Sequence, residues 1–431
     1  MNVNQIGYGE RIALIQAILG EYGLKSEAIT PVAYSLDFSW PFNNFIYKVA
    51  LQSPASPEIF PGTQPGTVPA PKDGLSMFII RMGNLKVSDL NHTNRVENEV
   101  ACSALAREAT KAAGLGSLVP EIYAWRAPKS LESPLEENFG WSICEFKVGK
   151  DLDTQFPLLS AEEQDHVIQQ LADIYSALQK AAIPPSVDRF GGITFDSQGN
   201  MVSGQTAMNK GGPWATLSDY WTEKLSAIVT GANENSFLQT SGDAGEKLSS
   251  RVKRFLDSGG VAQALADVNT TQRCLVHSDF TMNNVLFDTE SKKVTALIDF
   301  DFASINHPIE EHYFASFGDL GGGLRAVSTA LYRCIMSDDF EQQPLELSDS
   351  DKEIWHKAKS WNKAIVERNI LRPKTLAGAE KVEALRQFEE CLSKMRQDKD
   401  SFLAKYSEAG KQGLVPEPVA IVTRMLDTHI A

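Results

Sequence analysis

The chain has few cysteines, and they are not arranged to form a metal site or a disulfide framework. There are five, far apart in the sequence, and no Cys-x-x-Cys pair occurs. Disulfide-rich secreted domains and zinc ribbons both need paired, closely spaced cysteines. The sequence therefore argues against both classes, and it favours a reducing compartment. We expect a cytoplasmic protein.

Long hydrophobic runs and an excess of positive charge are also lacking. No apolar stretch approaches the roughly 18 residues of a membrane helix. The first residues, MNVNQIGYGERIALIQAILG, lack the basic start of a signal peptide. Lys and Arg number 41 against 55 Asp and Glu, a formal net charge of −14. Nonspecific nucleic-acid binding needs many basic side chains, so we expect neither a nucleic-acid nor a membrane partner.

The composition that remains is that of a globular protein. The chain has 431 residues, of which 42% are hydrophobic and 22% charged. A chain of this length can bury a large core. At about 100–200 residues per domain it should form two or three domains, or two lobes of one enzyme.

The first third of the chain reads as a small strand-rich lobe, in which apolar residues at helical spacing also predict a helix over 11–24. Apolar residues at helical spacing predict a helix over 95–113. A proline-rich segment at 52–75 reads as a loop between strands. Short apolar or alternating runs predict strands at 45–51, 75–82, 119–125 and 140–146.

The pattern becomes mostly helical after Gly149. A long amphipathic helix is expected over 160–182, with Ser160 and Glu163 forming a capping box at its start. Further helices are expected at 216–229, at 245–266 and from about 323 onward, with two strand-like pieces between 274 and 304. The sequence thus predicts an α+β protein with an N-terminal lobe, 1–146, and a mostly helical C-terminal lobe, 147–431.

The segment LVHSDFTMNNVLFDTESKKVTALIDFDFAS (275–304) carries the most specific pattern. It contains His277, Asp279 and Asn284 in the order H-x-D-x-x-x-x-N, and a second strand ends in Asp299. Phosphoryl transfer needs a carboxylate that accepts the proton of the attacking hydroxyl. It also needs oxygen ligands that hold Mg²⁺ against the nucleotide phosphates. Asp and Asn also favour ordinary turns, but His, Asp and Asn in this order between two apolar strands, with a further Asp at the end of the second strand, favour a catalytic site.

This segment resembles the catalytic loop and metal-binding strand of the aminoglycoside phosphotransferase family. Choline and ethanolamine kinases are relatives of that family. The proline-rich insert followed by FIIRMGN is similar to fungal members of uncertain substrate. The resemblance covers about residues 30–320. It implies a protein-kinase-like two-lobe fold, with a small antiparallel sheet and one helix in the N-terminal lobe. It also implies an ATP- and Mg²⁺-dependent kinase that acts on a hydroxyl group of a small molecule.

The family implies a role for each residue of the motif. Asp279 resembles the catalytic base, and Asn284 and Asp299 resemble the Mg²⁺ ligands. His277 resembles the histidine that supports the catalytic loop. From the residues alone, His277 could also be a general base.

Two N-terminal positions should complete the nucleotide site. Where the family has a lysine on the third strand, this chain has Arg81 in FIIRM. Arginine binds phosphate but is not interchangeable with lysine. Its partner should be a glutamate of the next helix. The pattern N-E-V-A favours Glu99 by resemblance, whereas helical spacing places Glu97 nearer the centre of the apolar face, so both stay open.

The remaining nucleotide contacts are less specific. The segment 142–152 resembles the hinge between lobes, where the backbone around Glu145 and Lys147 would contact the adenine. The nucleotide loop would be SLDFSWPFNN (35–44), which contains no glycine and therefore no Gly-x-Gly-x-x-Gly motif.

The sequence does not identify the phosphate acceptor. Acidic residues after the metal-binding strand could hold a cationic substrate, or they could be solvated charges; they are Asp301, Glu310 and Glu311. Two alternative functions are a choline- or ethanolamine-type kinase and a nucleotide-binding pseudokinase that acts as a scaffold or regulator. Arg81 and the glycine-free loop favour the pseudokinase, whereas the complete set of Asp279, Asn284 and Asp299 favours an enzyme.

Overall fold

The computed structural model of the chain describes residues 2–32, 40–208, 211–230, 247–325, 327–394 and 416–430. The chain divides into two compact units, each built from two separate stretches of sequence. The first contains Met1–Pro213 and Arg273–Ile370, and the second contains Trp214–Gln272 and Leu371–Ala431. All candidate site residues belong to the first unit.

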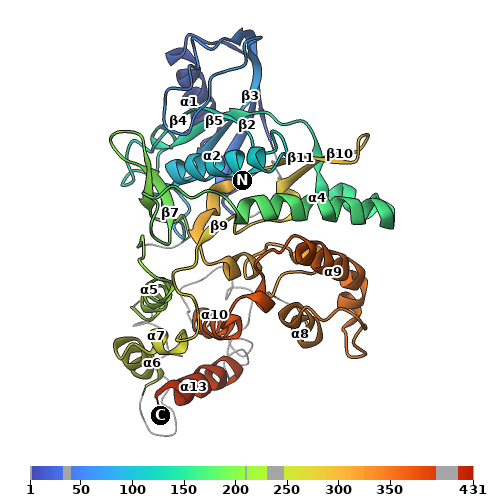
Figure 1. Cartoon of the computed structure of the whole chain (residues 1–431). Coiled ribbons are helices and arrows are strands. Elements are labelled where there is room, and N and C mark those ends of the chain that lie inside the picture. The colour runs from blue at the N-terminus through green and yellow to red at the C-terminus, as the bar shows by residue number, and fades with distance from the viewer. Residues whose placement is uncertain are drawn as a thin grey trace. The chain divides into compact units, whose positions relative to one another are not determined.

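The first unit begins with a five-stranded antiparallel sheet in the order β1-β2-β3-β5-β4 (Figure 1). Alternation along β2 buries Phe45, Tyr47, Val49 and Leu51 on one face, as expected for a sheet with one face against a core. The strand of this sheet that the sequence did not predict is β1, none of whose residues is buried. The strands are β1 (Ser26–Pro31), β2 (Asn44–Ala55), β3 (Leu75–Gly83), β4 (Ile122–Arg126) and β5 (Trp141–Glu145).

Two helices accompany this sheet. The helix α1 (Tyr8–Glu21) contributes Ile15, Ile18 and Leu19 to the core of the sheet. The predicted main helix is α2 (Arg95–Ala112), drawn across the sheet in Figure 1. It packs on β4 and β5 through a cluster made of Val96, Val100, Ile122 and Cys144. Most of the helix is buried, including its polar residues Arg95, Asn98, Glu99 and Arg107, whereas Glu108 and Lys111 near its end are exposed.

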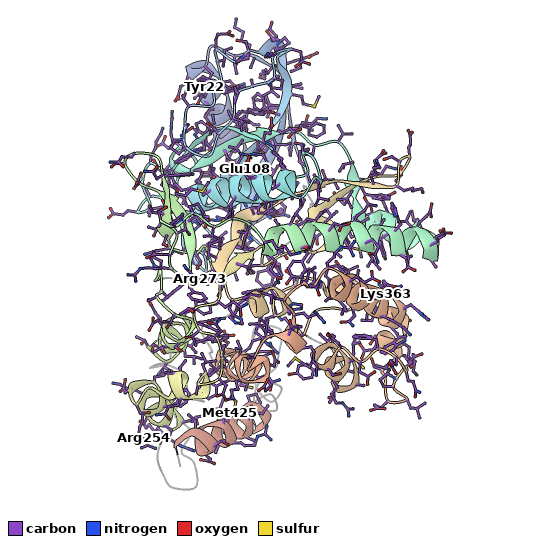
Figure 2. The ribbon with its side chains drawn as sticks, in the orientation of Figure 1. Tyr22, Glu108, Arg254, Arg273, Lys363 and Met425 are labelled. Atoms are coloured by element: carbon purple, nitrogen blue, oxygen red, sulfur yellow. The ribbon has the colours of Figure 1, made fainter. Side chains whose placement is uncertain are left out.

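The proline-rich segment between β2 and β3 folds back onto the same core. Phe60 and Ala70 are buried, and their neighbours Pro61 and Pro69 form an isolated bridge. Tyr22, labelled in Figure 2, follows α1, and its ring lies 5.0 Å from that of Phe60. The segment is thus a loop, as predicted, but it is held in place by the apolar residues between its prolines.

After β5 come a short helix, α3 (Leu152–Gln155), and a long one, α4 (Ala161–Gln179). The predicted capping box is confirmed, because the Ser160 side chain accepts from the Glu163 backbone N–H and the Glu163 side chain accepts from that of Ser160. Four buried residues of α4, Val167, Ile168, Leu171 and Tyr175, belong to the largest core cluster. This cluster also contains Leu275 and Phe300, which flank the catalytic motif.

Short strands surround that motif. β9 pairs with β12, and β10 pairs with both β11 and β6, all antiparallel. The helices that complete the first unit are α8 (Thr329–Ser337) and α9 (Asp349–Glu367). The strands are β6 (Lys150–Asp151), β7 (Gly192–Phe195), β8 (Met201–Gly204), β9 (Cys274–Val276), β10 (Val285–Asp288), β11 (Lys293–Leu297) and β12 (Ser304–Asn306).

The second unit is helical where it is described. The single helix predicted over 245–266 is two helices, because Gly259 adopts a left-handed conformation with φ of 76° and ends the first. The helices are α5 (Leu217–Thr230), α6 (Leu248–Asp257), α7 (Gly260–Ala264), α10 (Ala379–Lys394) and α13 (Pro416–Ile430).

These elements confirm the predicted fold class, an antiparallel N-terminal sheet with one main helix followed by a mostly helical region. The predicted lobe boundary after residue 146 lies inside the first unit, just beyond β5, and it stays a prediction. Among the described residues, no helix is long and apolar enough to span a membrane. All five cysteines are free and buried.

Candidate active site

The catalytic motif forms a tight loop between β9 and β10. The backbone turns at Ser278, whose φ of 66° is left-handed. The Asn284 amide then donates to the Asp279 carboxylate at 2.8 Å and to the Asp279 carbonyl at 2.9 Å. These two bonds close the loop and hold the Asp279 side chain in one orientation.

The environment of Asp279 suits a proton acceptor. Burial raises the pKa of its carboxyl group above the usual value, the Asn284 hydrogen bond lowers it, and the nearby Asp299 and Asp319 raise it further. A carboxylate of raised pKa is a better base than a solvated aspartate.

His277 lies beneath this loop and is fully buried. Its Nε2 lies 3.1 Å from the Ile298 carbonyl oxygen, and its Nδ1 accepts from the Asp279 backbone N–H at 3.3 Å. The ring also packs on Phe300, with 4.7 Å between the centroids. Burial lowers the pKa of His277 to about 4, so the ring is neutral near pH 7. These contacts favour loop support over proton transfer.

Asp299 follows β11 and also has a left-handed φ, 66°. The Ile298 N–H donates to the Asn284 carbonyl at 2.9 Å, which brings the two predicted metal ligands to neighbouring backbone positions. The Asp299 side chain is 34% exposed. Burial raises its pKa, but the adjacent Arg81 guanidinium more than offsets this, so its pKa lies below the usual value. Asp299 is therefore ionised and accessible.

Arg81, on β3, bridges two carboxylates. Its Nη2 donates to Asp299 Oδ1 at 2.7 Å, and its Nε lies 2.7 Å from Glu99 Oε1 of α2. The structure thus pairs Arg81 with Glu99 rather than with Glu97. Within the described part of the chain, Glu97 Oε2 is buried without a hydrogen-bond partner.

The charges of this bridge are strongly perturbed by burial. Burial alone would lower the pKa of Arg81, but the carboxylates of Asp299 and Glu99 raise it above its usual value. Burial raises the pKa of Glu99 to about 7; Arg81 acts in the opposite direction, while Asp301 and Asp299 add to the rise.

Arg95 belongs to the same region and was missed from the sequence, whereas Asn44 is the last residue of the predicted nucleotide loop. Arg95, at the start of α2, donates through Nε to Asp301 Oδ1 at 2.7 Å and also forms a close ion pair with Oδ2. The Asn44 amide donates to Asp301 Oδ2 at 3.1 Å. The signal for Arg95 was its spacing: Arg95 and Glu99 are four residues apart, so they share one face of α2.

The three acidic residues considered for substrate binding are all buried. Glu311 accepts from the backbone N–H groups of His277 at 2.6 Å and Ser278 at 3.0 Å, and from the Ser316 hydroxyl at 2.5 Å. Asp301 is occupied by Arg95 and Asn44. Their substrate role, like that of Glu310, stays a prediction. The contacts of Asp301 with Arg95 and Asn44, and those of Glu311 with the catalytic loop, favour a role in holding the site in place instead.

A cavity of about 400 Å³ connects these residues with the N-terminal sheet. Its lining includes Asn43 and Asn44 at the start of β2, Ile46 within it, and Asn283 and Asp299 from the catalytic region. Residues 35–39 of the predicted nucleotide loop lie outside the described residues, whereas 40–44 are described. The cavity is a candidate site for the nucleotide phosphates.

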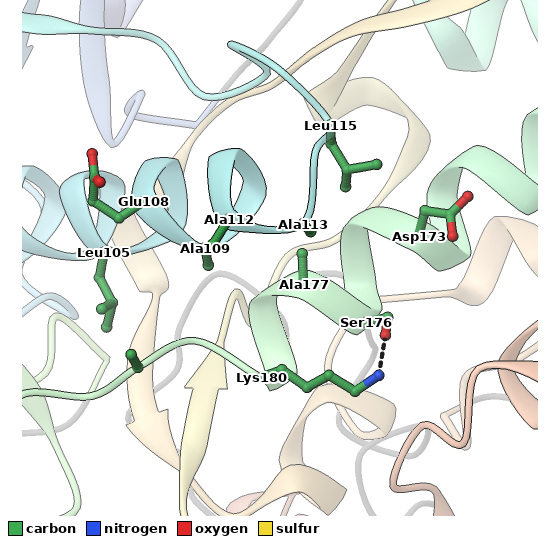
Figure 3. A pocket seen from close by; sticks show the side chains of 11 residues that line it. Leu105, Glu108, Ala109, Ala112, Ala113, Leu115, Asp173, Ser176, Ala177 and Lys180 are labelled. Atoms are coloured by element: carbon green, nitrogen blue, oxygen red, sulfur yellow. Dashed lines mark hydrogen bonds between the residues drawn. The ribbon is translucent and has the colours of Figure 1, made fainter.

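A second cavity, about 530 Å³, lies between α2 and α4 (Figure 3). Its walls are mainly alanines, with Glu108, Asp173 and Lys180 at the edges. The Lys180 ammonium donates to the Ser176 hydroxyl at 2.8 Å. None of the predicted site residues lines this second cavity.

The predicted hinge, 142–152, begins within β5 and continues beyond its end. The Glu145 backbone N–H donates to the Glu121 carbonyl at 2.7 Å, so that group is already used within the sheet. The Lys147 ammonium lies 2.8 Å from the Glu145 carboxylate and donates to the Ser117 carbonyl at 2.8 Å. The side chains of both residues therefore bind neighbouring groups, and their backbone contact with adenine stays a prediction.

The donor set fits Mg²⁺. Asn284 and Asp299 offer hard oxygen atoms, and Asp299 is ionised and lines the cavity. Magnesium commonly binds one or two protein oxygens together with phosphates and water. In the described ranges no group of three or more His, Cys, Asp or Glu side chains could hold a metal ion, so a zinc-type site finds no support there.

Comparison with known proteins identifies a family. The profile of the family described as "Phosphotransferase enzyme family" matches residues 90–327. This is more than half of the chain, and it includes α2, the catalytic motif and Asp299. No curated protein matched the sequence.

Several solved structures are similar over nearly their whole length. A putative aminoglycoside phosphotransferase from Ralstonia eutropha JMP134 shares 13% identity, with 96% of this chain and 97% of that chain covered and a TM-score of 0.49. The gentamicin complex of APH(2")-IIa shares 12%, with 95% of both chains covered and a TM-score of 0.46. ADP-bound APH(2'')-Ib shares 12%, with 97% of both covered and a TM-score of 0.44. These likenesses do not identify a substrate for this chain.

Proposed function

Because the chain belongs to the phosphotransferase enzyme family, we propose that it transfers the γ-phosphoryl group of ATP to a hydroxyl group of a small molecule. The observation that carries the proposal is the closed loop in which Asn284 holds the Asp279 carboxylate, next to the ionised Asp299. One carboxylate is thus oriented for proton transfer and the other is available for a metal.

In this proposal Asp279 accepts the proton of the acceptor hydroxyl as the oxygen attacks phosphorus. Asn284 fixes the orientation of that carboxylate, and His277 supports the loop from below as a neutral ring. Glu311 holds the backbone of His277 and Ser278 through its two oxygens. None of these supporting groups needs to gain or lose a proton during the reaction.

The nucleotide would lie in the cavity between β2 and Asp299. Asn284 and Asp299 would hold Mg²⁺, which when bound neutralises charge on the transferring group. Arg81, fixed by Glu99, would contact the phosphates with the edge of its guanidinium that now faces Asp299. The backbone near Glu145 and Lys147 would contact adenine.

The acceptor class remains part of the proposal. A choline- or ethanolamine-type kinase would use the same catalytic groups with a different acceptor. A cytoplasmic location and a kinship with fungal members also remain proposals. One observation favours the pseudokinase alternative. Arg81, at the position where the family has a lysine, is hydrogen-bonded to Asp299, the predicted metal ligand.

Turnover tests these alternatives. The purified chain would be incubated with Mg²⁺, ATP or GTP, and a panel of aminoglycosides, amino alcohols and sugars, and phosphorylated product would be measured by mass spectrometry. An Asp279→Asn variant is the matched inactive control. Product from the parent but not from the variant supports the kinase. Nucleotide binding with no product from any acceptor would support the scaffold instead.

A further inference from the structure

We propose that the buried Arg95–Asp301 ion pair positions Asn43 and Asn44, where β2 begins, relative to the segment that carries Asp299. The proposal rests on the proposed function for the identity of the ligand. It concerns four residues, Asn43, Asn44, Arg95 and Asp301, which we call the anchoring cluster.

The anchoring cluster joins three elements that are far apart in the sequence. Arg95 starts α2, Asp301 lies two residues after Asp299, and Asn43 and Asn44 lie at the start of β2. Arg95 holds both carboxylate oxygens of Asp301. Its Nη2 also donates to the Asn43 carbonyl at 3.0 Å and to Asn44 Oδ1 at 3.2 Å, while the Asn44 amide donates to Asp301 Oδ2 at 3.1 Å.

The burial of this cluster shows that its charges are not a surface feature. The side chains of Arg95 and Asp301 are each 3% exposed. Removing two charges from water is costly, and well-packed apolar side chains often stabilise a protein equally well. A buried ion pair with additional hydrogen bonds to a loop therefore points to a requirement for defined geometry.

The attachment of α2 to the catalytic region does not depend on Arg95 alone. Asn98, one turn further along the helix, donates to the Ala303 carbonyl at 2.9 Å and accepts from the Ile193 N–H at 2.8 Å. Arg95 and Asp301 differ from Asn98 because they also contact Asn43 and Asn44.

Asn43 and Asn44 matter because of where they lie. Both line the 400 Å³ cavity, together with Asp299. The segment before them lacks the glycines whose backbone would approach phosphates closely. Asn43 and Asn44, held in place by Arg95 and Asp301, can instead set the distance between the nucleotide and Asp299. Loss of the cluster should therefore weaken nucleotide binding, not only folding.

Two single variants and their double variant separate the effect of the ion pair on nucleotide binding from its effect on folding stability. Arg95→Met and Asp301→Leu each leave a buried charge without its partner, so each should lower the melting temperature. Each should also raise the dissociation constant for Mg·ATP about tenfold or more, the size expected for losing one charge-assisted hydrogen bond. The double variant should recover melting temperature, because no unpaired charge remains, but it should keep the weak Mg·ATP binding.

Arg107→Met is the matched control. Arg107 is a buried arginine of the same helix, 3% exposed, and it donates to the Pro120 and Gly66 carbonyls at 3.3 and 3.4 Å. This variant should lose stability and retain Mg·ATP affinity. The proposal is overturned if Arg107→Met weakens binding as much as Arg95→Met, or if the double variant regains binding together with melting temperature.

Asn44→Ala tests the cluster even if the charge variants fail to fold. It leaves the Arg95–Asp301 pair and the Arg95 bond to the Asn43 carbonyl in place and removes only the side-chain bonds of Asn44. Calorimetry should show weaker Mg·ATP binding with a nearly unchanged melting temperature; parental affinity would overturn the proposal. A parent that binds Mg·ATP but phosphorylates no acceptor refutes the proposed function alone, and a parent that binds no nucleotide refutes both.

Discussion

Replacing Arg81 by lysine should impair nucleotide binding even though the charge is kept. Arg81 reaches Glu99 with Nε and Asp299 with Nη2, each at 2.7 Å. Lysine has one shorter-reaching nitrogen and cannot occupy both positions. One charge-assisted contact is worth about 1.5–3 kcal/mol, so its loss corresponds to a roughly 10- to 100-fold weaker interaction.

Alanine should have a larger and different effect. Arg81→Ala leaves the buried Glu99 without its cation, and breaking a buried pair by removing one partner costs about 3–5 kcal/mol of folding stability. Glu99→Ala should resemble it, and the double variant should be less than additive, with a coupling of roughly 0.5–3 kcal/mol, because the two groups are in contact.

Calorimetric titration with Mg·ATP gives the dissociation constants of the parent, the two single variants and the double variant, and it needs no knowledge of the acceptor. Urea unfolding gives the folding stability of each. Glu97→Ala is the control, since Glu97 lies on the same helix but does not contact Arg81. Coupling of Arg81 with Glu97 and not with Glu99 would contradict the geometry described above. An unchanged dissociation constant in Arg81→Ala would show that the phosphate contact comes from elsewhere.

Three further predictions concern the catalytic region. Asp279→Asn should retain Mg·ATP binding but lower turnover by about 10²–10⁴-fold, as for loss of a general base; near-normal turnover would exclude that role. Asp299→Ala should weaken the Mg²⁺ dependence of ATP binding, whereas Asp288→Ala, at the end of β10, should not; coincident Mg²⁺ titrations would make Asp299 a structural residue. Burial raises the pKa of Glu311 from 4.5 to about 7. Between pH 4.5 and 7 the folded state therefore binds a proton that the unfolded state has lost. The contribution of Glu311 to folding stability should fall as the pH rises through this range. The difference in melting temperature between the parent and Glu311→Gln should shrink from pH 4.5 to pH 7, and a difference independent of pH would show that Glu311 does not titrate there.

Much of the fold could be predicted because local patterns agreed with the tertiary structure. Alternation in 45–51 marked β2, and Ser160 with Glu163 marked the start of α4. The exposed β1 was missed because it has no buried alternation, and the helix expected over 245–266 was too long because Gly259 adopts a left-handed conformation that composition alone does not reveal.

The site was predicted less completely. His277, Asp279 and Asn284 lie within eight residues, so their proximity followed from the sequence itself. Arg95 and Asp301 are separated by 206 residues, and nothing local indicates that they pair. The spacing of apolar residues favoured Glu97, yet most of α2 is buried, so the centre of its apolar face does not identify the residue that meets β3.

The same burial bears on the proposal that Arg81 takes the place of a lysine in the nucleotide site. Glu99, Asp299 and Asp301 place three carboxylates close together, and the guanidinium groups of Arg81 and Arg95 pair with them. A lysine would satisfy one carboxylate at a time. The planar fork of Arg81 holds Glu99 with one edge while the other remains directed at Asp299, where phosphate and metal are expected. The excess of negative charge that is left favours a divalent cation at this position, as phosphoryl transfer requires.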